Sequence, residues 1–438
     1  MYFLPRIHKK RAGKVSFFII LSFLLLTSEF GVCYNIFIAG NCLRRPVRNH
    51  FLREKGMEKG SVAVLDVRSD TVTVFVGKKG VNNTFELKAM NSEPYGGYRY
   101  GEFYDVEDLR KATLKALGAV EQVLGESLKQ ITVGVPGEFI KVIPREKEID
   151  FNKRRKIGIK EIELLEESGK EELAGHRLIR VTSMIYVTGD NRRVVDPCGI
   201  VSSRLSGKLS YFYCTNYFAE AVERVFEGRK FKISYLPTTF ITASYLIPPE
   251  TRDECALFLD IGFLSSTLLV VLGGGVPLER TFSVGRADII VSLLKALNLP
   301  YDATAALLND ANLFVTGDVK TRYFDYGGAS YEVDIALMNE AIKNGLDELW
   351  ASFTPVLEEW SASEITNLPI YVSGGGLEGI RGAREYMSKR LNRILEEVKP
   401  DLAFYNKPSM SSRIALMDAA CEDNRKSGFL YRLLNGGF

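Results

Sequence analysis

Histidine is scarce in this sequence, and no two cysteines stand close together. Only three histidines occur, His8, His50 and His176, which leaves almost no material for a histidine-based metal site or a Ser-His-Asp triad. The six cysteines are scattered along the chain, without any pair at the spacing of a metal or redox motif. This cysteine usage favours a reducing compartment.

A strong charge of either sign is also missing. The formal net charge is only +3, and the basic residues cluster locally, near the N-terminus and at 153–156. This balance indicates no polyanionic partner, so nucleic-acid binding is not expected. Hydrophobic residues make up 46% of the chain and charged residues 25%, as in globular proteins. A length of 438 residues exceeds what one hydrophobic core organises, so two or more domains are expected.

The first 56 residues differ from the rest of the chain. A basic segment precedes an apolar run at 15–27, Glu29 interrupts it, and apolar residues resume at 30–40 before a second basic cluster. In isolation this extension is typical of a signal peptide or a transmembrane signal anchor. Five basic residues flank it on each side, so the positive-inside rule assigns no orientation. The favoured interpretation is that Met57, directly before the first strand, is the real start.

Two segments share one pattern, in which a buried strand ends on an aspartate and a polar turn leads to a second strand. The first runs over 61–77 with Asp66, and the second over 256–273 with Asp260. Their similarity predicts two domains of like topology that face one another. A carboxylate at the tip of a buried strand, beside glycine and hydroxyl residues, suits a metal ion and the phosphates that it neutralises. Each segment taken alone is also consistent with an ordinary hairpin whose aspartate caps a turn.

The rest of the chain is predicted to mix helices and strands. An amphipathic helix at 106–124 and a buried strand at 131–135 complete the first α/β layer. Pro136-Gly137 and a highly charged stretch then break the pattern, which indicates an inserted α+β module at 136–235. Later helices are expected at 286–297 and over most of 302–366, with a strand-rich interruption at 314–333.

A glycine cluster follows the last predicted strand. Residues 369–373 form a short apolar run, Gly374-Gly375-Gly376 follow, and a helix is expected at 380–395. A strand, a glycine cluster and a helix in this order let a backbone approach a nucleotide closely. A tight turn in any α/β protein produces the same pattern.

The order of these three sites resembles the phosphate 1, phosphate 2 and adenosine motifs of the fold shared by actin, heat-shock chaperones and sugar kinases. Within that fold the chain is similar to the FtsA family of bacterial cell-division proteins, from about residue 57 to the C-terminus. The segments that carry the resemblance are 134–137, 176–187, 196–199, 208–216, 237–246, 260–262 and 371–376.

The resemblance implies an α/β, two-domain actin/Hsp70-like ATPase fold with an inserted α+β subdomain of the SHS2 type, called 1C. The expected parts are the extension (1–56), the first part of subdomain 1A (57–135), the insertion with the return to 1A (136–235), the end of 1A and start of 2A (236–300), subdomain 2B (301–366), the end of 2A (367–421) and a linker with a terminal helix (422–438).

The resemblance further implies that ATP and Mg²⁺ bind in the cleft between the two domains. Asp66 and Asp260 are then the catalytic and metal-binding residues, which position hydrated Mg²⁺, and Thr267 contacts phosphate. The remaining cofactor-binding residues are expected to be Ser69, Gly262, Ser266, Gly374, Gly375 and Gly376.

Two departures from the family pattern concern the phosphate turns. Arg68 stands where the family usually has glycine, and Phe263-Leu264-Ser265-Ser266 replace a glycine-rich turn. Glycines at such positions let backbone N–H groups reach phosphate oxygens without a Cβ in the way. The departures therefore bear more on hydrolysis than on binding, and any ATPase activity is expected to be slow.

The C-terminal residues carry an amphipathic pattern. Phe429, Leu430, Leu433 and Leu434 fall on one face of a helix, and Arg432 is placed to meet anionic head groups. In the family this segment is the membrane anchor. The alternative is a terminal helix that packs on its own protein.

The favoured function is that of an ATP-binding adaptor at the cytoplasmic face of the cell membrane. It would assemble into filaments, bind FtsZ and tether the FtsZ ring at the division site. Two alternatives are a nucleotide-free actin-like scaffold and a PilM-like pilus-assembly actin homologue, and the terminal amphipathic segment argues against the second.

Overall fold

The computed structural model describes residues 60–80, 84–315, 320–361 and 368–426, all within one unit of the chain that spans 44–438. The N-terminal extension 1–56 and the predicted membrane-binding residues Phe429, Leu430, Arg432, Leu433 and Leu434 lie outside the described residues. In the described part of the chain, no helix is both long and apolar enough to cross a bilayer. The predictions for these two terminal segments therefore stay predictions.

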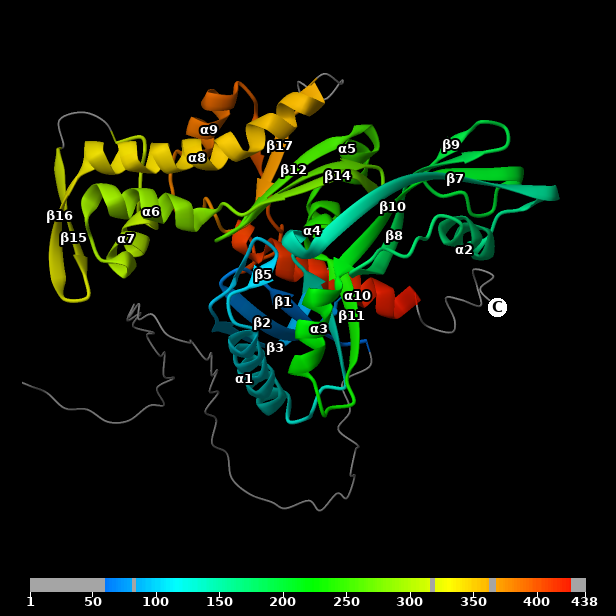
Figure 1. Cartoon of the computed structure of the whole chain (residues 1–438), viewed down its shortest axis with the longest axis horizontal. Helices are drawn as coiled ribbons and strands as arrows, with labels where there is room; N and C mark the ends of the chain where they lie inside the picture. The colour runs from blue at the N-terminus through cyan, green and yellow to red at the C-terminus, as the bar shows by residue number, and fades with distance from the viewer. Residues whose placement is uncertain (1–59, 81–83, 316–319, 362–367, 427–438) are drawn as a thin grey trace, which may run out of the picture. The chain divides into compact units, whose positions relative to one another are not determined.

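Two five-stranded sheets share one topology, as the repeated pattern predicted (Figure 1). In each sheet three consecutive strands form an antiparallel meander, and two later strands add in parallel beside its first strand. The first sheet contains β1 (Val62–Val67), β2 (Thr71–Lys79), β3 (Phe85–Pro94), β6 (Gln130–Val135) and β11 (Lys232–Pro237). The second contains β12 (Ala256–Ile261), β13 (Ser266–Leu272), β14 (Gly275–Phe282), β17 (Ile370–Ser373) and β18 (Leu395–Glu397).

Helices cover both sheets and fill the space between them. Apolar side chains of α4 and α10 pack together with β1 of the first sheet and β12 of the second in one core. The outer face of the first sheet packs on α1 and α3, and that of the second on α6 to α9. The helices are α1 (Val106–Leu124), α3 (Asn216–Val225), α4 (Thr238–Leu246), α5 (Pro249–Glu254), α6 (Arg286–Leu297), α7 (Tyr301–Leu308), α8 (Ile335–Ser361), α9 (Ala383–Leu391) and α10 (Ser411–Lys426).

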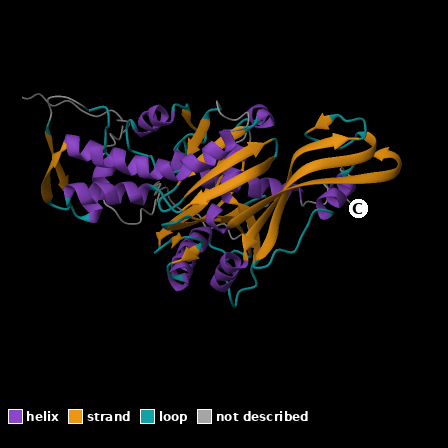
Figure 2. Cartoon of the chain, turned by 45° about the horizontal axis from the view of Figure 1, so that its top comes forward, coloured by secondary structure: helices purple, strands orange, loops and turns teal. Residues whose placement is uncertain are grey.

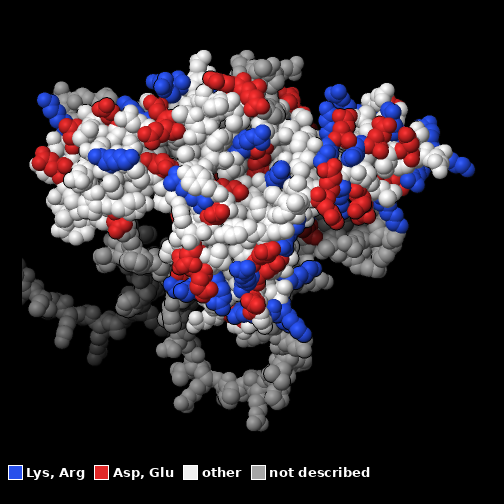
Figure 3. Space-filling model, viewed as in Figure 1, with Lys and Arg blue, Asp and Glu red and all other residues white. Residues whose placement is uncertain are grey.

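The chain leaves the first sheet after β6 and returns at β11, and the residues between form a separate antiparallel sheet (Figure 2). Its strand order is β7-β10-β8-β9, with α2 packed on one face. The charged residues 141–156 belong to β7, and their side chains alternate over much of the strand between partly buried and exposed positions. Figure 3 shows charges of both signs interspersed over this region. The elements are β7 (Ile140–Lys156), α2 (Ile159–Glu167), β8 (His176–Thr188), β9 (Arg193–Val194) and β10 (Val201–Thr215).

The region 302–366, predicted to be mostly helical, contains helices and a β-hairpin in its described residues. Helices α6 and α8 lie side by side, and β15 (Thr321–Tyr326) pairs with β16 (Ala329–Asp334) near one end of α8. The last predicted helix, 380–395, is shorter than expected, because Gly382 and Asn392 in the left-handed region bound α9 on both sides. Residues 395–397 instead form β18 at the edge of the second sheet.

Candidate functional site

The two strand-aspartate-turn segments face a common cavity of about 240 Å³. The turn after β1 and the turn after β12 approach one another closely enough for the Leu264 N–H to donate to Ser69 Oγ at 3.0 Å. The glycine cluster after β17 and the residues just before α10 close the other sides. The lining residues used below are Asp66, Arg68, Asp70, Thr238, Thr239, Asp260, Thr267, Arg286, Gly374, Gly375, Ser409 and Ser412.

Most of the site residues expected from the sequence line this cavity. They are Asp66, Ser69, Asp260, Gly262, Thr267, Gly374 and Gly375. Ser266 and Gly376 do not line it. The Ser266 hydroxyl donates to the carbonyl of Val284, and the Gly376 N–H donates to the carbonyl of Ile261. These two residues hold the walls of the cavity, and their predicted contact with a cofactor stays a prediction.

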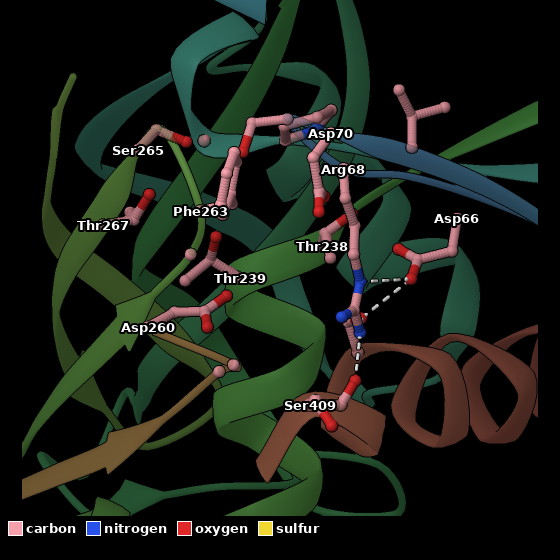
Figure 4. Close-up of a pocket in the computed structure, with 18 of the residues that line it drawn as sticks. Asp66, Arg68, Asp70, Thr238, Thr239, Asp260, Phe263, Ser265, Thr267 and Ser409 are labelled. Carbon is pink, nitrogen blue, oxygen red and sulfur yellow. Dashed lines mark hydrogen bonds and ion pairs between the residues drawn. The ribbon is translucent and has the colours of Figure 1, made fainter. Parts of the chain in front are cut away.

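Asp66, at the end of β1, is completely buried and surrounded by cationic and hydroxyl groups. Arg68 Nε donates to Asp66 Oδ2 at 2.9 Å (Figure 4). Ser412 Oγ donates to the same oxygen at 3.0 Å. Arg413 Nε lies 3.6 Å from that oxygen, and burial lowers the pKa of Arg413 to about 10. Asp66 Oδ1 is buried without a partner among the described residues. The carboxylate is therefore already neutralised by side chains of this chain.

Arg68 links the turn after β1 to the segment before α10. Its Nη2 donates to the carbonyl oxygen of Ser409 and, at 2.7 Å, to Ser412 Oγ. Burial opposes the charge, but the neighbouring carboxylates of Asp66 and Asp70 outweigh it, so that the pKa of Arg68 is raised. The guanidinium is consequently fixed at the position where a cation would otherwise meet Asp66.

Asp260, at the end of β12, lies across the cavity from Asp66 and is only partly buried. Burial raises the pKa of Asp260 to about 6, while Arg68 acts in the opposite direction. Gly374, the first residue after β17, lies next to this carboxylate. Its φ is +87°, and a Cβ there would lie 2.3 Å from Asp260 Oδ1. Glycine is therefore required where the second sheet's glycine cluster meets this carboxylate.

Arg286, the first residue of α6, supports the glycine cluster from behind. Its Nη1 donates to the carbonyls of Gly376 and Glu378, and its Nη2 donates to Asn309 Oδ1 at 2.8 Å. The sequence analysis did not single out this residue. A cation in the first turn of a helix opposes the helix dipole, and that mismatch was the one signal that Arg286 serves another purpose.

The N-terminus of α4 also faces the cavity. Thr238 and Thr239, the first two residues of this helix, line it, and the helix has no side-chain cap. Thr238 is 7% exposed, and its hydroxyl has no partner among the described residues. Free N–H groups at a helix start attract anions. The sequence analysis predicted this helix but assigned its start no role.

Contacts outside the cavity hold the two halves of the site together. Arg99 donates to the carbonyl of Ser283 at 2.7 Å and to Asp288 Oδ1 at 2.9 Å. Glu138 Oε1 accepts from Ser283 Oγ at 3.0 Å. These bonds join the connections of the first sheet to the start of α6.

Asp260→Asn is expected to stabilise the protein near neutral pH by about 1–3 kcal/mol. The folded state binds the Asp260 proton up to a pH of about 6, whereas the unfolded chain releases it near 3.8, so folding stability falls as pH rises between these values. Urea unfolding of both proteins at several pH values measures the difference. The difference in stability between the two proteins should be largest above pH 6 and should vanish near pH 3.8, the ordinary pKa of an aspartate. An equal difference at all pH values would contradict this account.

Sequence comparison places the chain beside two curated cell-division proteins. It is 18% identical to the cell division protein FtsA of Pseudomonas aeruginosa over 248 residues, which cover 56% of this chain and 59% of that protein. It is 18% identical to FtsA of Bacillus subtilis over 379 residues, which cover 83% of this chain and 84% of that protein. The match thus spans less than two thirds of the first protein's length and most of the second's. No protein-family model matches the chain.

Structural comparison finds a similar fold in a solved structure. A chain of the PilM-PilN type IV pilus biogenesis complex superposes with a TM-score of 0.56 at 14% sequence identity, covering 82% of this chain and 98% of that chain. Likeness at this level of identity reports the fold.

Proposed function

We propose, from the premise that this chain is an FtsA-like protein with the actin-like ATPase fold, that it is a filament-forming adaptor of bacterial cell division. It would bind ATP, attach to the cytoplasmic face of the membrane and recruit FtsZ at the division site. The observation that carries the proposal is the similarity to the Bacillus FtsA along 83% of the chain. The other cell-division protein is matched over 59% of its length, so the activity of the whole protein is part of the proposal.

The cavity supports nucleotide binding by its shape and by its donors. The backbone of Gly375 leaves open space on the side of the cavity, since a Cβ at this position would meet only Ser409 Cβ, at 3.4 Å. The N-terminus of α4 offers N–H groups to a phosphate. The volume of the cavity, about 240 Å³, lies below the usual ligand-pocket range of about 300–1,000 Å³. ATP would therefore enter after the contacts of Arg99 and Glu138 with Ser283 open.

The residues present do not fit the Mg²⁺ that the fold implies. A divalent cation at Asp66 would lie next to the guanidinium of Arg68, whose Nε already donates to Asp66 Oδ2 at 2.9 Å. Two cations would then compete for one carboxylate. The predicted metal role of Asp66 stays a prediction that its surroundings oppose, and hydrolysis of bound ATP is expected to be slow.

The terminal residues 429–434 are proposed as the membrane anchor on their sequence pattern alone. A short segment with four apolar side chains binds weakly, and filaments multiply that contact by avidity. Leu433→Glu is expected to abolish co-sedimentation of filaments with anionic vesicles while leaving the fold intact. The matched control is Ile394→Glu, because Ile394 is apolar, 69% exposed and remote from the C-terminus in sequence.

Loss of vesicle binding in the Leu433→Glu variant alone would support the anchor. Equal binding by Leu433→Glu and the unaltered chain, or unfolding of the Leu433→Glu variant, would contradict it. The second candidate function is pilus assembly, favoured by the structural likeness to PilM in its complex with PilN. Binding of a PilN-type peptide without any binding of FtsZ would decide for it.

A further inference from the structure

We propose that Arg68 is the resident cation of the phosphate site, so that the cleft binds a nucleoside triphosphate without a divalent metal ion. The inference rests on the proposed nucleotide binding and specifies how the phosphates are held. It starts from the observation that the side chain at position 68 occupies the coordination space of the Asp66 carboxylate.

The guanidinium of Arg68 is held in one orientation by three bonds. Nε is bound to Asp66, and Nη2 is bound to the Ser409 carbonyl and the Ser412 hydroxyl. Nη1 has no partner among the described residues, and 24% of the side chain is exposed where it lines the cavity. A fixed guanidinium with one free edge is preorganised for phosphate oxygens, because little rotamer freedom remains to be lost on binding.

A second donor group faces the same cavity independently of Arg68. It is the N-terminus of α4, whose first two residues, Thr238 and Thr239, line the cavity and which has no side-chain cap. Figure 4 shows Thr238 and Thr239 between Arg68 and Asp260. An arginine edge and helix N–H groups together offer donors from two directions to an anion with several oxygens.

The carboxyl groups around the cavity are arranged so that a metal-free anion is tolerated. Asp66 is neutralised by Arg68, Ser412 and the nearby Arg413. The repulsion that a divalent cation normally removes is thus reduced by the protein itself.

Calorimetric titration of the full chain with ATP, once with excess Mg²⁺ and once with excess EDTA, tests the proposal. The two dissociation constants should agree within about threefold. Adenosine should bind at least about tenfold more weakly than ATP in EDTA, since it lacks the phosphates. Inorganic phosphate should compete with ATP in EDTA but bind more weakly than ATP, because it lacks the adenosine part.

Arg68→Gly should weaken binding in EDTA by about tenfold or more and make it depend on Mg²⁺, since it exposes Asp66 and removes the cation. The ATP affinity of Arg68→Lys in EDTA should lie between those of Arg68→Gly and the unaltered chain, because an ammonium keeps the charge but lacks the planar guanidinium geometry. The control is Arg280→Ala, since Arg280 is exposed and its described hydrogen bond goes to the carbonyl of Glu279. This variant should bind as the unaltered chain does.

Binding by the unaltered chain that requires Mg²⁺ would overturn the inference while leaving the proposed function intact. This comparison needs no variant, so poor folding of Arg68→Gly does not affect it. Absence of ATP binding under both conditions would instead overturn nucleotide binding itself and favour the nucleotide-free scaffold.

Discussion

Gly374→Ala is expected to destabilise the protein by at least about 3 kcal/mol. Gly374 has φ at +87°, where a Cβ is strained, and the added atom would lie 2.3 Å from both Asp260 Oδ1 and the Ile261 carbonyl oxygen. The carbonyl belongs to β12 in the centre of the second sheet, so the clash cannot be relieved by a side-chain rotation. Urea unfolding followed by circular dichroism measures the loss.

Gly375→Ala is the matched control for this prediction. It is the next residue, and the nearest atom to its Cβ would be Ser409 Cβ at 3.4 Å, an ordinary contact. Its stability should change by less than about 1 kcal/mol. If both variants lose stability equally, the close approach of the glycine cluster to β12 is not what requires glycine.

Arg286→Ala is expected to reduce stability by about 3 kcal/mol or more and to weaken ATP binding as well. The change leaves the carbonyls of Gly376 and Glu378 and the side-chain oxygen of Asn309 without their donor. The glycine cluster then loses the group that holds it against α6. Thermal unfolding and an ATP titration report the two effects separately.

Arg280→Ala serves as the control here too, because it removes an arginine from the neighbouring strand β14 without touching the cluster. It should leave both readouts unchanged. Arg286→Lys should recover only part of the loss, since an ammonium does not reproduce the three donated bonds. Full recovery with lysine would show that the charge of Arg286, and not its geometry, supports the site.

The local pattern of apolar residues was sufficient to predict the parts of the fold that occur twice. Both strand-aspartate-turn segments were predicted because their strands are continuous apolar runs, which is what burial on both faces produces. The helices over 106–124 and 286–297 have the predicted bounds, since their apolar residues recur at helical spacing. The insertion was located by the break in pattern after β6.

The charged strand β7 shows where local pattern fails. Its seventeen residues include many Lys, Arg and Glu side chains, and the sequence predicted an inserted α+β module here without a strand at 140–156. What makes it a strand is pairing with β10 along nearly its whole length, and the partner residues lie far away in sequence. Tertiary pairing decides strand formation more often than intrinsic preference does.

The chemistry of the site depended on contacts that no local pattern contains. The sequence identified Arg68 as a departure from glycine, but its bond to Ser412 joins residues 344 positions apart. Arg286 likewise is the first residue of an amphipathic helix, and its partners lie on two other segments, the loop after β17 and the residue after α7. The aspartates and glycines were found because strand ends and glycine clusters can be recognised locally, whereas the bonds of Arg68 to Asp66 and Ser412 could not be.

The most direct test of the account is recruitment of FtsZ to a membrane by the full chain. Fluorescent FtsZ from the source organism of this chain would be mixed with anionic vesicles, ATP and the full chain, and the vesicles would be sedimented. The account predicts that FtsZ pellets with the vesicles only when the full chain is present, and that the Leu433→Glu variant leaves FtsZ in the supernatant. FtsZ that stays in the supernatant with the unaltered chain, although the chain itself pellets with the vesicles, would contradict the adaptor function.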